Sequence, residues 1–304
     1  MIAYHLRAHE DIPITGLCLC LGFFDGMHLA HRRLFEVTLE AARTEGAKTG
    51  LVTFSTSILS YINKEKYDAL TPMKDKIERA RISGFDYFFV LEVDDDLIGL
   101  EAETFVKRFL EPSRKLIVGF DYTFGRYGRG NVVLLEKLLP GKTIVVPELR
   151  YFGKKVGSRR IRDLLSAGRI ELANRLLGNK YLIKGRVIPG KGRGRLLGYP
   201  TANIDYDGYY LPKSGVYLTQ IRVDGLLYTA MTNIGYNPTF GGDKLTLEAH
   251  IIGIDEQLYG KELEIAFIHY IREEMRFQTQ TELIEQLHRD EQEVQEYLKS
   301  RRAS

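Results

Sequence analysis

The sequence has few cysteines, no long apolar run and no excess of charge of either sign. Its only cysteines, Cys18 and Cys20, stand two positions apart within an apolar stretch, and we expect reduced core residues rather than a bridge. That usage suits a reducing compartment such as the cytoplasm. The 43 basic and 40 acidic residues nearly balance, at a net charge of +3. The bulk charge therefore gives no argument for nucleic acid or a membrane as partner.

Features that target or anchor a protein are also missing from the sequence. The first residues do not combine a basic region with a long apolar run, so we expect no signal peptide. No apolar stretch approaches the roughly 18 residues that a membrane helix needs. The chain does have 304 residues, 44% of them apolar. That length is more than one compact domain needs and is enough for two domains with substantial cores.

The first half alternates short apolar runs with helical patterns. Leu34, Val37 and Ala41 recur at helical spacing after the first run, and further helical patterns cover residues 74–83 and 101–110. Strands that alternate with helices predict a parallel sheet flanked by helices. Ligands bind such sheets at the carboxyl ends of the strands. The predicted strands are 17–21, 49–54, 85–93, 115–120 and 143–149.

Two histidines follow the first predicted strand. His28 and His31 lie three positions apart at the start of a helical pattern, so they share one face of the helix. The N-terminus of a helix attracts phosphate, and two imidazoles there could hydrogen-bond phosphate oxygens and stabilise charge in a transition state. For the pair taken alone, a cap neighbour and a surface residue are the more ordinary interpretation.

The sequence pattern changes near the middle of the chain. Residues 161–177 are helical in pattern and end at a Gly-Asn C-cap, so we place a domain boundary between 1–180 and 181–304. Short alternating strands follow and predict an antiparallel barrel, and an amphipathic helix closes the chain. The predicted strands of this half are 182–188, 215–223, 226–233, 245–254 and 263–271.

The stretch 190–203 reads G-K-G-R-G-R-L-L-G-Y-P-T-A-N. Its glycines allow a ligand to approach the main chain, and successive main-chain N–H groups can form a nest for anionic oxygens. Thr201 and Asn203 add hard oxygen ligands of the kind that Mg²⁺ accepts beside phosphate, so a nucleotide phosphate with its metal is the natural ligand. A solvated basic loop is the alternative for the first six residues. A Walker loop is excluded because Gly192 stands where Ser or Thr is required.

The run G-Y-P-T-A-N resembles the signature of the flavokinase, or riboflavin kinase, family. The resemblance continues through N-I-G-Y-N-P-T-F at 233–240, L-E-A-H at 247–250, L-Y-G-K at 258–261 and residues 272–277. It implies a six-stranded antiparallel barrel with a terminal helix, and an enzyme that phosphorylates riboflavin with ATP and Mg²⁺ to give FMN.

Within this resemblance Glu248 takes the place of the family's catalytic glutamate and would deprotonate the ribityl 5′-hydroxyl of riboflavin. Glu248 lies on a strand face that could point into the barrel interior. Thr201 and Asn203 would hold Mg²⁺, and Arg272 would lie near the flavin. The residues expected to bind the ATP phosphates are Gly190, Lys191, Gly192, Gly194, Pro200, Asn233 and Gly235.

The first half resembles a second module. G-x-F-D-G-x-H-x-x-H at 22–31 is similar to the H-x-G-H signature of the nucleotidyltransferase superfamily, in particular to the adenylylating module of prokaryotic bifunctional FAD synthetases. L-T-P at 70–72, V-G-F-D-Y-T-F-G at 118–125 and S-R-R-I-R at 158–162 support this resemblance. It implies a Rossmann-like nucleotidyltransferase domain, in which the FMN phosphate attacks the α-phosphorus of ATP in line and yields FAD and pyrophosphate.

In this module His28 and His31 would be catalytic, and Asp121 and Thr123 would position FMN. The expected small-molecule partners of the whole chain are riboflavin, FMN and ATP, with no nucleic acid and no membrane among them. The residues expected to bind ATP and phosphate in the first module are Gly22, Asp25, Gly26, Ser158, Arg160 and Arg162.

The first module departs from the family pattern at several positions, whereas the kinase motifs show no comparable loss. Each departure removes a polar or small group expected near ATP or FMN, which leads to the hypothesis that FAD formation is weak or absent while FMN formation is intact. Three interpretations stay open: a bifunctional enzyme, a riboflavin kinase with a nucleotide-binding or structural first module, and a non-enzymatic flavin sensor. The departures are Phe23, Ala30, Ser55, Ser57, Gly157 and Arg159.

Overall fold

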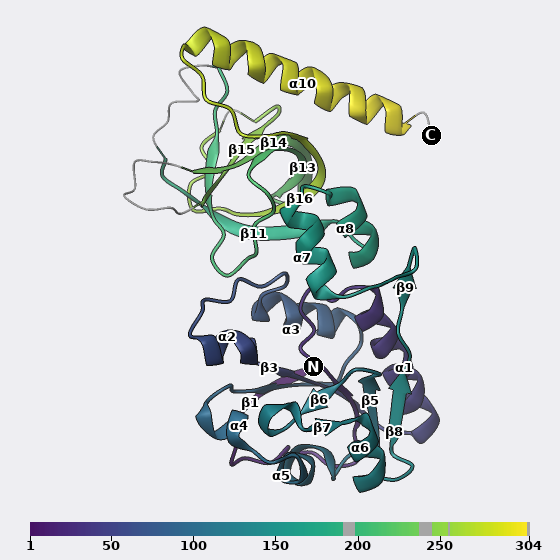
Figure 1. Ribbon diagram of the computed structural model, residues 1–304. Coiled ribbons are helices and arrows are strands. Elements are labelled where there is room, and N and C mark those ends of the chain that lie inside the picture. The colour runs from purple at the N-terminus through teal and green to yellow at the C-terminus, as the bar shows by residue number, and fades with distance from the viewer. Residues whose placement is uncertain (191–197, 237–244, 255, 303–304) are drawn as a thin grey trace. The chain divides into compact units, whose positions relative to one another are not determined.

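The computed structural model describes residues 1–190, 198–236, 245–254 and 256–302 (Figure 1). They form two compact units, Met1–Ser158 and Arg159–Ser304. The predicted combination of a parallel sheet and an antiparallel barrel is confirmed. Three residues expected to bind phosphate, Lys191, Gly192 and Gly194, lie outside the described residues.

The first unit is built on a six-stranded parallel sheet in the order β1-β4-β3-β2-β5-β8. The strand order reverses beside β2, because the chain continues to β3 on one side and later returns to β5 on the other. The five predicted strands are present; β1 was not predicted, because it is a short edge strand whose residues are mostly exposed. The strands are β1 (Ile2–Leu6), β2 (Cys18–Leu21), β3 (Thr49–Phe54), β4 (Tyr87–Leu91), β5 (Lys115–Gly119) and β8 (Thr143–Val146).

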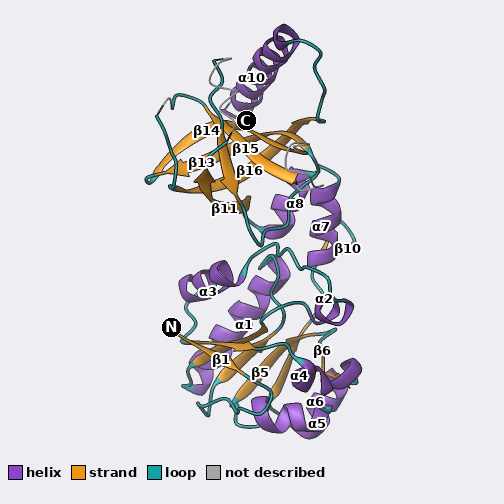
Figure 2. Cartoon of the chain, turned by 90° about the vertical axis from the view of Figure 1, so that its left-hand side faces the viewer, coloured by secondary structure: helices purple, strands orange, loops and turns teal. Residues whose placement is uncertain are grey.

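Helices cover both faces of this sheet (Figure 2). Alternate strand residues enter two separate apolar clusters: Leu19 and Leu21 pack in one, and Cys18 and Cys20 in the other. Both cysteines are buried free thiols, as expected. The helical elements are α1 (Leu29–Glu45), α2 (Ile58–Asn63), α3 (Met73–Ile82), α4 (Asp95–Gly99), α5 (Ala102–Phe105), the π-helical turn η1 (Val106–Leu110), the 3₁₀ turn η2 (Arg126–Gly128) and α6 (Val132–Leu138).

Two small antiparallel ribbons complete the first unit. The strand β6 (Thr123–Phe124) pairs with β7 (Gly130–Asn131), and β9 (Arg150–Tyr151) pairs with β10 (Lys154–Lys155). The first ribbon follows β5 and the second follows β8, so both come after the carboxyl ends of strands in the main sheet.

The second unit is a closed six-stranded barrel in the order β11-β12-β15-β14-β13-β16, with every pair antiparallel. Asp224 and Gly225, both at positive φ, form the hairpin turn between β13 and β14. The strand β12 was not predicted, because it is only four residues long and begins inside the P-T-A-N motif. The strands are β11 (Tyr181–Ile188), β12 (Ala202–Asp205), β13 (Gly215–Val223), β14 (Leu226–Tyr236), β15 (Leu245–Ile251) and β16 (Glu262–Arg272).

The closing helix α10 (Gln280–Arg302) packs on β14 and β16 of the barrel (Figure 1). Thr279 caps it, because its Oγ1 accepts the main-chain N–H of Glu282 at 3.2 Å. Val294 is fully buried against the barrel, and Leu287 and Leu298 pack beside it. The apolar stripe of this helix is therefore core packing.

Two helices precede the barrel, α7 (Ser158–Ser166) and α8 (Ile170–Leu177). Asn174 joins α8 to the barrel: its Oδ1 accepts the N–H of Tyr181 at 2.7 Å and its Nδ2 donates to the carbonyl of Phe267 at 2.9 Å. These helices thus belong to the compact unit of the barrel. Among the described residues, no helix has the length and apolar character that crossing a membrane requires.

Candidate active sites

A cavity of about 370 Å³ opens in the first unit where the strand order reverses. Its walls come from the segment after β2, the segment after β5 and residues 146–149 and 155–158. The carboxyl edge at such a reversal is the usual ligand site of a parallel sheet. Six residues predicted for the first module line this cavity: Gly22, His28, His31, Asp121, Thr123 and Ser158.

His28 and His31 stack ring on ring in this cavity, with centroids 3.7 Å apart. The Nδ1 of His28 caps α1 by accepting the main-chain N–H of His31 at 3.4 Å. That acceptor role leaves the proton of a neutral His28 on Nε2, where it is a donor. The Nδ1 of His31 is buried and has no hydrogen-bond partner among the described residues. A buried polar atom of this kind calls for a partner from a ligand or water.

Burial sets the protonation state of both histidines. It lowers the pKa of His28 to about 4, and it lowers the pKa of His31 well below its usual value, helped by the nearby charges of His28 and Lys76. Both imidazoles are therefore neutral at pH 7 in the free protein. They contribute hydrogen bonds to a phosphate rather than full positive charges.

The loop between β2 and α1 is held in an unusual backbone conformation. Phe24 and Met27 take φ angles of 53° and 40°, in the left-handed region that side chains disfavour. The carboxylate of Asp25 accepts the hydroxyl of Tyr67 at 2.7 Å and the N–H of Thr71 at 3.1 Å. Asp25 is almost fully buried, so in this structure it anchors the loop.

The neighbouring residues of the loop are anchored as well. Ser158 Oγ donates to the carbonyl of Asp25 at 2.8 Å. The carbonyl of Phe23 accepts Lys76 Nζ at 2.7 Å and Thr53 Oγ1 at 3.0 Å, and Lys76 Nζ lies 4.0 Å from the centroid of the Phe23 ring. Lys76 was not predicted as a site residue, because a lysine in an amphipathic helix normally faces solvent; here it is 3% exposed.

The departures from the family pattern have local roles in the structure. Ser55 Oγ accepts the N–H of Val93 at 3.0 Å, and Ser57 Oγ caps α2 by accepting the N–H of Ser60 at 3.3 Å. Phe23 is anchored through its carbonyl, which any residue supplies. These substitutions therefore leave the loop and the strand ends intact.

Other predicted residues of the first module lie at the cavity wall, in the anchored loop or in α7. Asp121 pairs with Lys155 at the cavity wall, and Gly26 lies in the anchored loop at a φ of 84°. Arg160 and Arg162 belong to α7 in the other compact unit, where the Arg162 guanidinium lies 4.6 Å from the centroid of the Tyr210 ring. Their contact with ATP stays a prediction.

In the second unit, three predicted residues form a row across three neighbouring strands. Asn203 of β12 lies opposite Glu248 of β15, which lies opposite Asn233 of β14. Directly opposed residues of antiparallel strands place their side chains on one face, about 5 Å apart at Cβ. We call Asn203, Glu248 and Asn233 the polar row.

The polar row lies on the outer face of the barrel. Leu247 and Ala249, which flank Glu248 in β15, are buried, whereas Glu248 is half-buried. Because successive strand residues alternate between faces, Glu248 points away from the interior. The suggestion that its face points into the barrel was wrong, and the outer position gives a substrate direct access to the carboxylate.

Two glycines make room for the side chains of this face. A Cβ on Gly190 would overlap the amide of Asn203, and a Cβ on Gly235 would lie 2.5 Å from Oε1 of Glu274 and 3.0 Å from Nδ2 of Asn233. Both glycines were expected to touch phosphate, which stays a prediction. Their observed role is to let polar side chains lie flat against the main chain.

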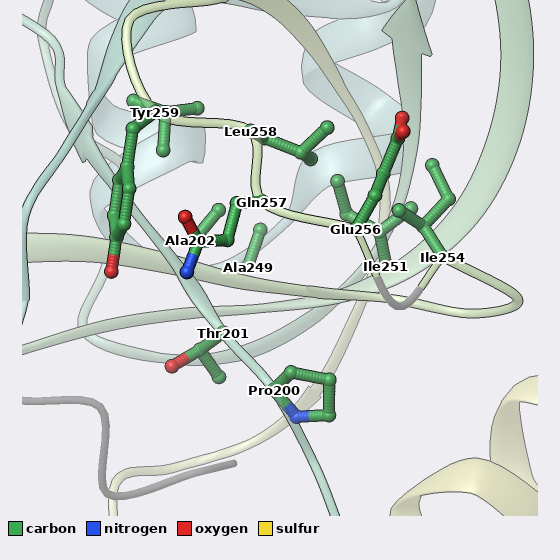
Figure 3. Close-up of a pocket in the computed structure, with 11 residues that line it drawn as sticks. Pro200, Thr201, Ala202, Ala249, Ile251, Ile254, Glu256, Gln257, Leu258 and Tyr259 are labelled. Carbon is green, nitrogen blue, oxygen red and sulfur yellow. The ribbon is translucent and has the colours of Figure 1, made fainter.

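Thr201 opens onto a small hollow of about 80 Å³. Figure 3 shows the Thr201 and Tyr259 hydroxyls on the same side of it, while the Glu256 carboxylate points away from Thr201. The rest of the lining is mainly apolar. It is formed by Val187, Pro200, Ala202, Ala249, Ile251, Ile254, Gln257 and Leu258.

The residues before Thr201 are held by aromatic side chains. His250 Nδ1 lies 2.9 Å from the carbonyl oxygen of Pro200, and the Tyr199 hydroxyl lies 2.9 Å from Nδ1 of His288 in α10. The closing helix thereby fixes the start of the P-T-A-N segment.

Arg272 makes a different contact from the one expected. Its Nε and Nη2 each donate to the carboxylate of Asp290 in α10 at 2.8 Å, and Asp290 is 1% exposed. A bidentate pair of this geometry fixes the guanidinium firmly. A contact between Arg272 and the flavin stays a prediction.

Comparison with known proteins matches each half of the chain to a known family. Residues 13–160 match the FAD synthetase family and residues 177–298 match the riboflavin kinase family. The bifunctional riboflavin kinase/FMN adenylyltransferase of Listeria monocytogenes is 36% identical, over 97% of this chain and 96% of that protein. The protein of the same description from Bacillus subtilis is 33% identical, over 98% and 97%.

A solved structure has the same fold along the whole chain. It is a Streptococcus pneumoniae protein described as a macrolide-efflux protein, which is 28% identical and superposes with a TM-score of 0.88 over 97% of this chain and 99% of that chain. The two family matches and the full-length relatives show that this chain belongs to the bifunctional riboflavin kinase/FMN adenylyltransferase family.

Proposed function

We propose that this chain makes FAD from riboflavin in two steps. It phosphorylates riboflavin with ATP to give FMN and ADP, and it then transfers the AMP group of a second ATP to FMN, which releases pyrophosphate. The single observation that carries this proposal is the full-length match to relatives named for both activities. The two sites described above supply suitable chemistry for each step.

The kinase step is assigned to the polar row and Thr201. Glu248 takes the proton of the ribityl 5′-hydroxyl, whose oxygen attacks the γ-phosphorus of ATP as the bond to ADP breaks. The Thr201 hydroxyl and the Asn203 amide oxygen are hard ligands suited to Mg²⁺, which when bound would neutralise phosphate charge.

The adenylyl step is assigned to the cavity of the first unit. A phosphate oxygen of FMN attacks the α-phosphorus of ATP, and the bond to the β-phosphate oxygen breaks. His28 and His31 donate hydrogen bonds to phosphate oxygens where charge builds up. Gly22 and the anchored loop shape the phosphate site, and Asp121 and Thr123, which also line the cavity, position FMN.

The proposal also covers the division of the chain, two arginines and the compartment. We assign the adenylyltransferase to residues 1–180 and the kinase to residues 181–304, and the arginines Arg160 and Arg162 to ATP. The small-molecule substrates and the buried free cysteines fit an enzyme of the cytoplasm.

A riboflavin kinase with an inactive first module is the second candidate. The observation that favours it is Phe23, which lines the cavity at a position where the departure removes a polar or small group. The anchored loop and the intact histidine pair favour the bifunctional enzyme instead.

A timed incubation with riboflavin, ATP and Mg²⁺, resolved by chromatography, separates the two candidates. FMN followed by FAD is the expected result, and FAD also forms when the reaction starts from FMN. FMN alone from both starting points would establish the second candidate and overturn the adenylyl assignment.

Glu248→Ala tests the kinase assignment within the same assay. Loss of a general base lowers the rate of FMN formation by about a hundredfold or more, while FAD formation from added FMN stays at the wild-type rate. Glu264→Gln, which alters an exposed ion pair of the barrel, is the matched control. Near wild-type FMN formation by Glu248→Ala would show that another group takes the proton.

A further inference from the structure

A second carboxylate, that of Glu274, reaches the face that carries the polar row. Its Oε1 lies 2.5 Å from the point where Gly235 would carry a Cβ, and the Asn233 amide lies 3.0 Å from the same point. Gly235 pairs with Thr246 in the adjacent strand, two residues along from the pair of Asn233 and Glu248. Residues two apart on a strand share a face and lie roughly 6.8 Å apart. The Glu274 carboxylate therefore lies on the same face as the polar row, next to Asn233.

The loop that carries Glu274 is fixed by the two residues before it. Arg272 is paired with the buried Asp290, and Glu273 pairs with Lys213 at 2.7 Å. Glu274 itself is exposed, and it forms no ion pair with any residue that the structure describes. An exposed carboxylate held over a glycine beside a proposed catalytic base is placed to bind a ligand.

We propose that Glu274 is a substrate-binding residue that accepts hydrogen bonds from the inner hydroxyls of the ribityl chain, while Glu248 acts on the terminal hydroxyl. This inference rests on the proposed kinase function. A ribityl chain carries hydroxyls on consecutive carbons, so a chain that ends at Glu248 brings further hydroxyls toward Gly235. A carboxylate only accepts hydrogen bonds, and bonds to a charged acceptor are the strong ones.

Gly235 leaves free the space that the Glu274 carboxylate occupies. Its φ is not among the positive values, so alanine is free of backbone strain there. The added methyl group would meet the end of a flexible side chain and push the Glu274 carboxylate off this face. Gly235→Ala therefore displaces the carboxylate without deleting it, which gives a second, independent variant.

The test compares riboflavin with a flavin analogue that carries a 5-hydroxypentyl chain and so lacks the inner hydroxyls. Glu274→Ala lowers kcat/KM for riboflavin by about tenfold or more, mainly through KM, and changes kcat/KM for the analogue less than twofold. Glu274→Gln, which keeps a neutral acceptor, recovers part of the loss. Gly235→Ala also lowers kcat/KM for riboflavin more than for the analogue, and Glu264→Gln, which alters an exposed ion pair of the barrel, behaves as wild type with both substrates.

Equal losses with riboflavin and the analogue would overturn the proposal, since a structural defect does not depend on the inner hydroxyls. A loss restored by raising Mg²⁺ would overturn it as well, and would assign Glu274 to the cation. The wild-type arm keeps the two hypotheses apart: a wild-type protein that forms no FMN refutes the proposed function, whereas an active wild type whose variants treat both flavins alike refutes only the role of Glu274.

Discussion

At the scale of single residues, burial decides what the two histidines can do. The sequence shows only that they share a helix face, which fits charged and neutral rings equally well. In the structure His28 is 3% exposed, and burial holds its pKa at about 4. The imidazoles therefore act at neutral pH as oriented hydrogen-bond donors in the free protein.

This burial predicts an acid sensitivity of the first unit. The unfolded chain has a histidine pKa of about 6.5, above the folded value of about 4 for His28. Between these values the unfolded state binds more protons, so the free energy of unfolding falls as the pH is lowered through this window. For His28 the loss between pH 7 and pH 5 is about 2 kcal/mol.

The measurement is urea unfolding followed by circular dichroism at pH 7 and pH 5, for the wild type and His28→Asn. Asparagine keeps a good helix cap and does not titrate, so the variant loses about 2 kcal/mol less than the wild type over this interval. The same pH dependence in both proteins would show that His28 is not buried in its neutral form.

At the scale of elements, the loop between β2 and α1 has a strained backbone that its hydrogen bonds keep in place. Two non-glycine residues at positive φ cost on the order of 1–3 kcal/mol each. Hydrogen bonds from Lys76, Thr53 and Ser158 to loop carbonyls offset that cost. Local sequence patterns did not reveal these contacts, because the donors come from three other segments of the chain.

Lys76→Met is therefore expected to damage adenylylation selectively. Removing the donor leaves the half-buried carbonyl of Phe23 with one partner fewer and lets the loop relax, so FAD formation from FMN falls by about tenfold or more. FMN formation from riboflavin stays unchanged in the same preparation. Lys74→Met, at an exposed position of the same helix, serves as the control, and an equal loss of both activities would point to general misfolding.

The closing helix α10 depends on a buried ion pair. Asp290→Ala leaves Arg272 without its main partner in a buried setting, which costs about 3 kcal/mol or more of unfolding free energy. Glu285→Ala removes an exposed pair with Arg289 and costs less than about 1 kcal/mol. Urea unfolding of both variants measures the difference. Similar small losses of unfolding free energy in both would show that water replaces Asp290 as the partner of Arg272.

At the scale of the whole molecule, each proposed activity has its own fold and core. The helices α7 and α8 belong structurally to the barrel unit, although the sequence pattern places the boundary at 180. The α8 residues Ile170, Ala173 and Leu176 are fully buried, and Asn174 bonds to two barrel strands. A barrel without these helices would expose apolar surface.

Two fragments test this organisation. We expect residues 159–304 to fold and form FMN but no FAD, and residues 181–304 to be several kcal/mol less stable, because each large apolar side chain contributes about 1.5–3 kcal/mol on burial. Thermal melting and the FMN assay on both fragments provide the measurement. Equal stability would place the structural boundary at 180.

The sequence by itself determined the fold class and the family. Alternating strands and helices indicated a parallel sheet, the change of period indicated a barrel, and short motifs identified the chemistry, since each of these signals is contained in neighbouring residues. Tertiary structure alone decided which side chains meet. The polar row depends on the register of three strands, the outward direction of Glu248 on closure of the barrel, and the contacts of Lys76, Arg272 and Glu274 on packing between distant segments. Such pairings arise only when the chain closes on itself, so no local period records them.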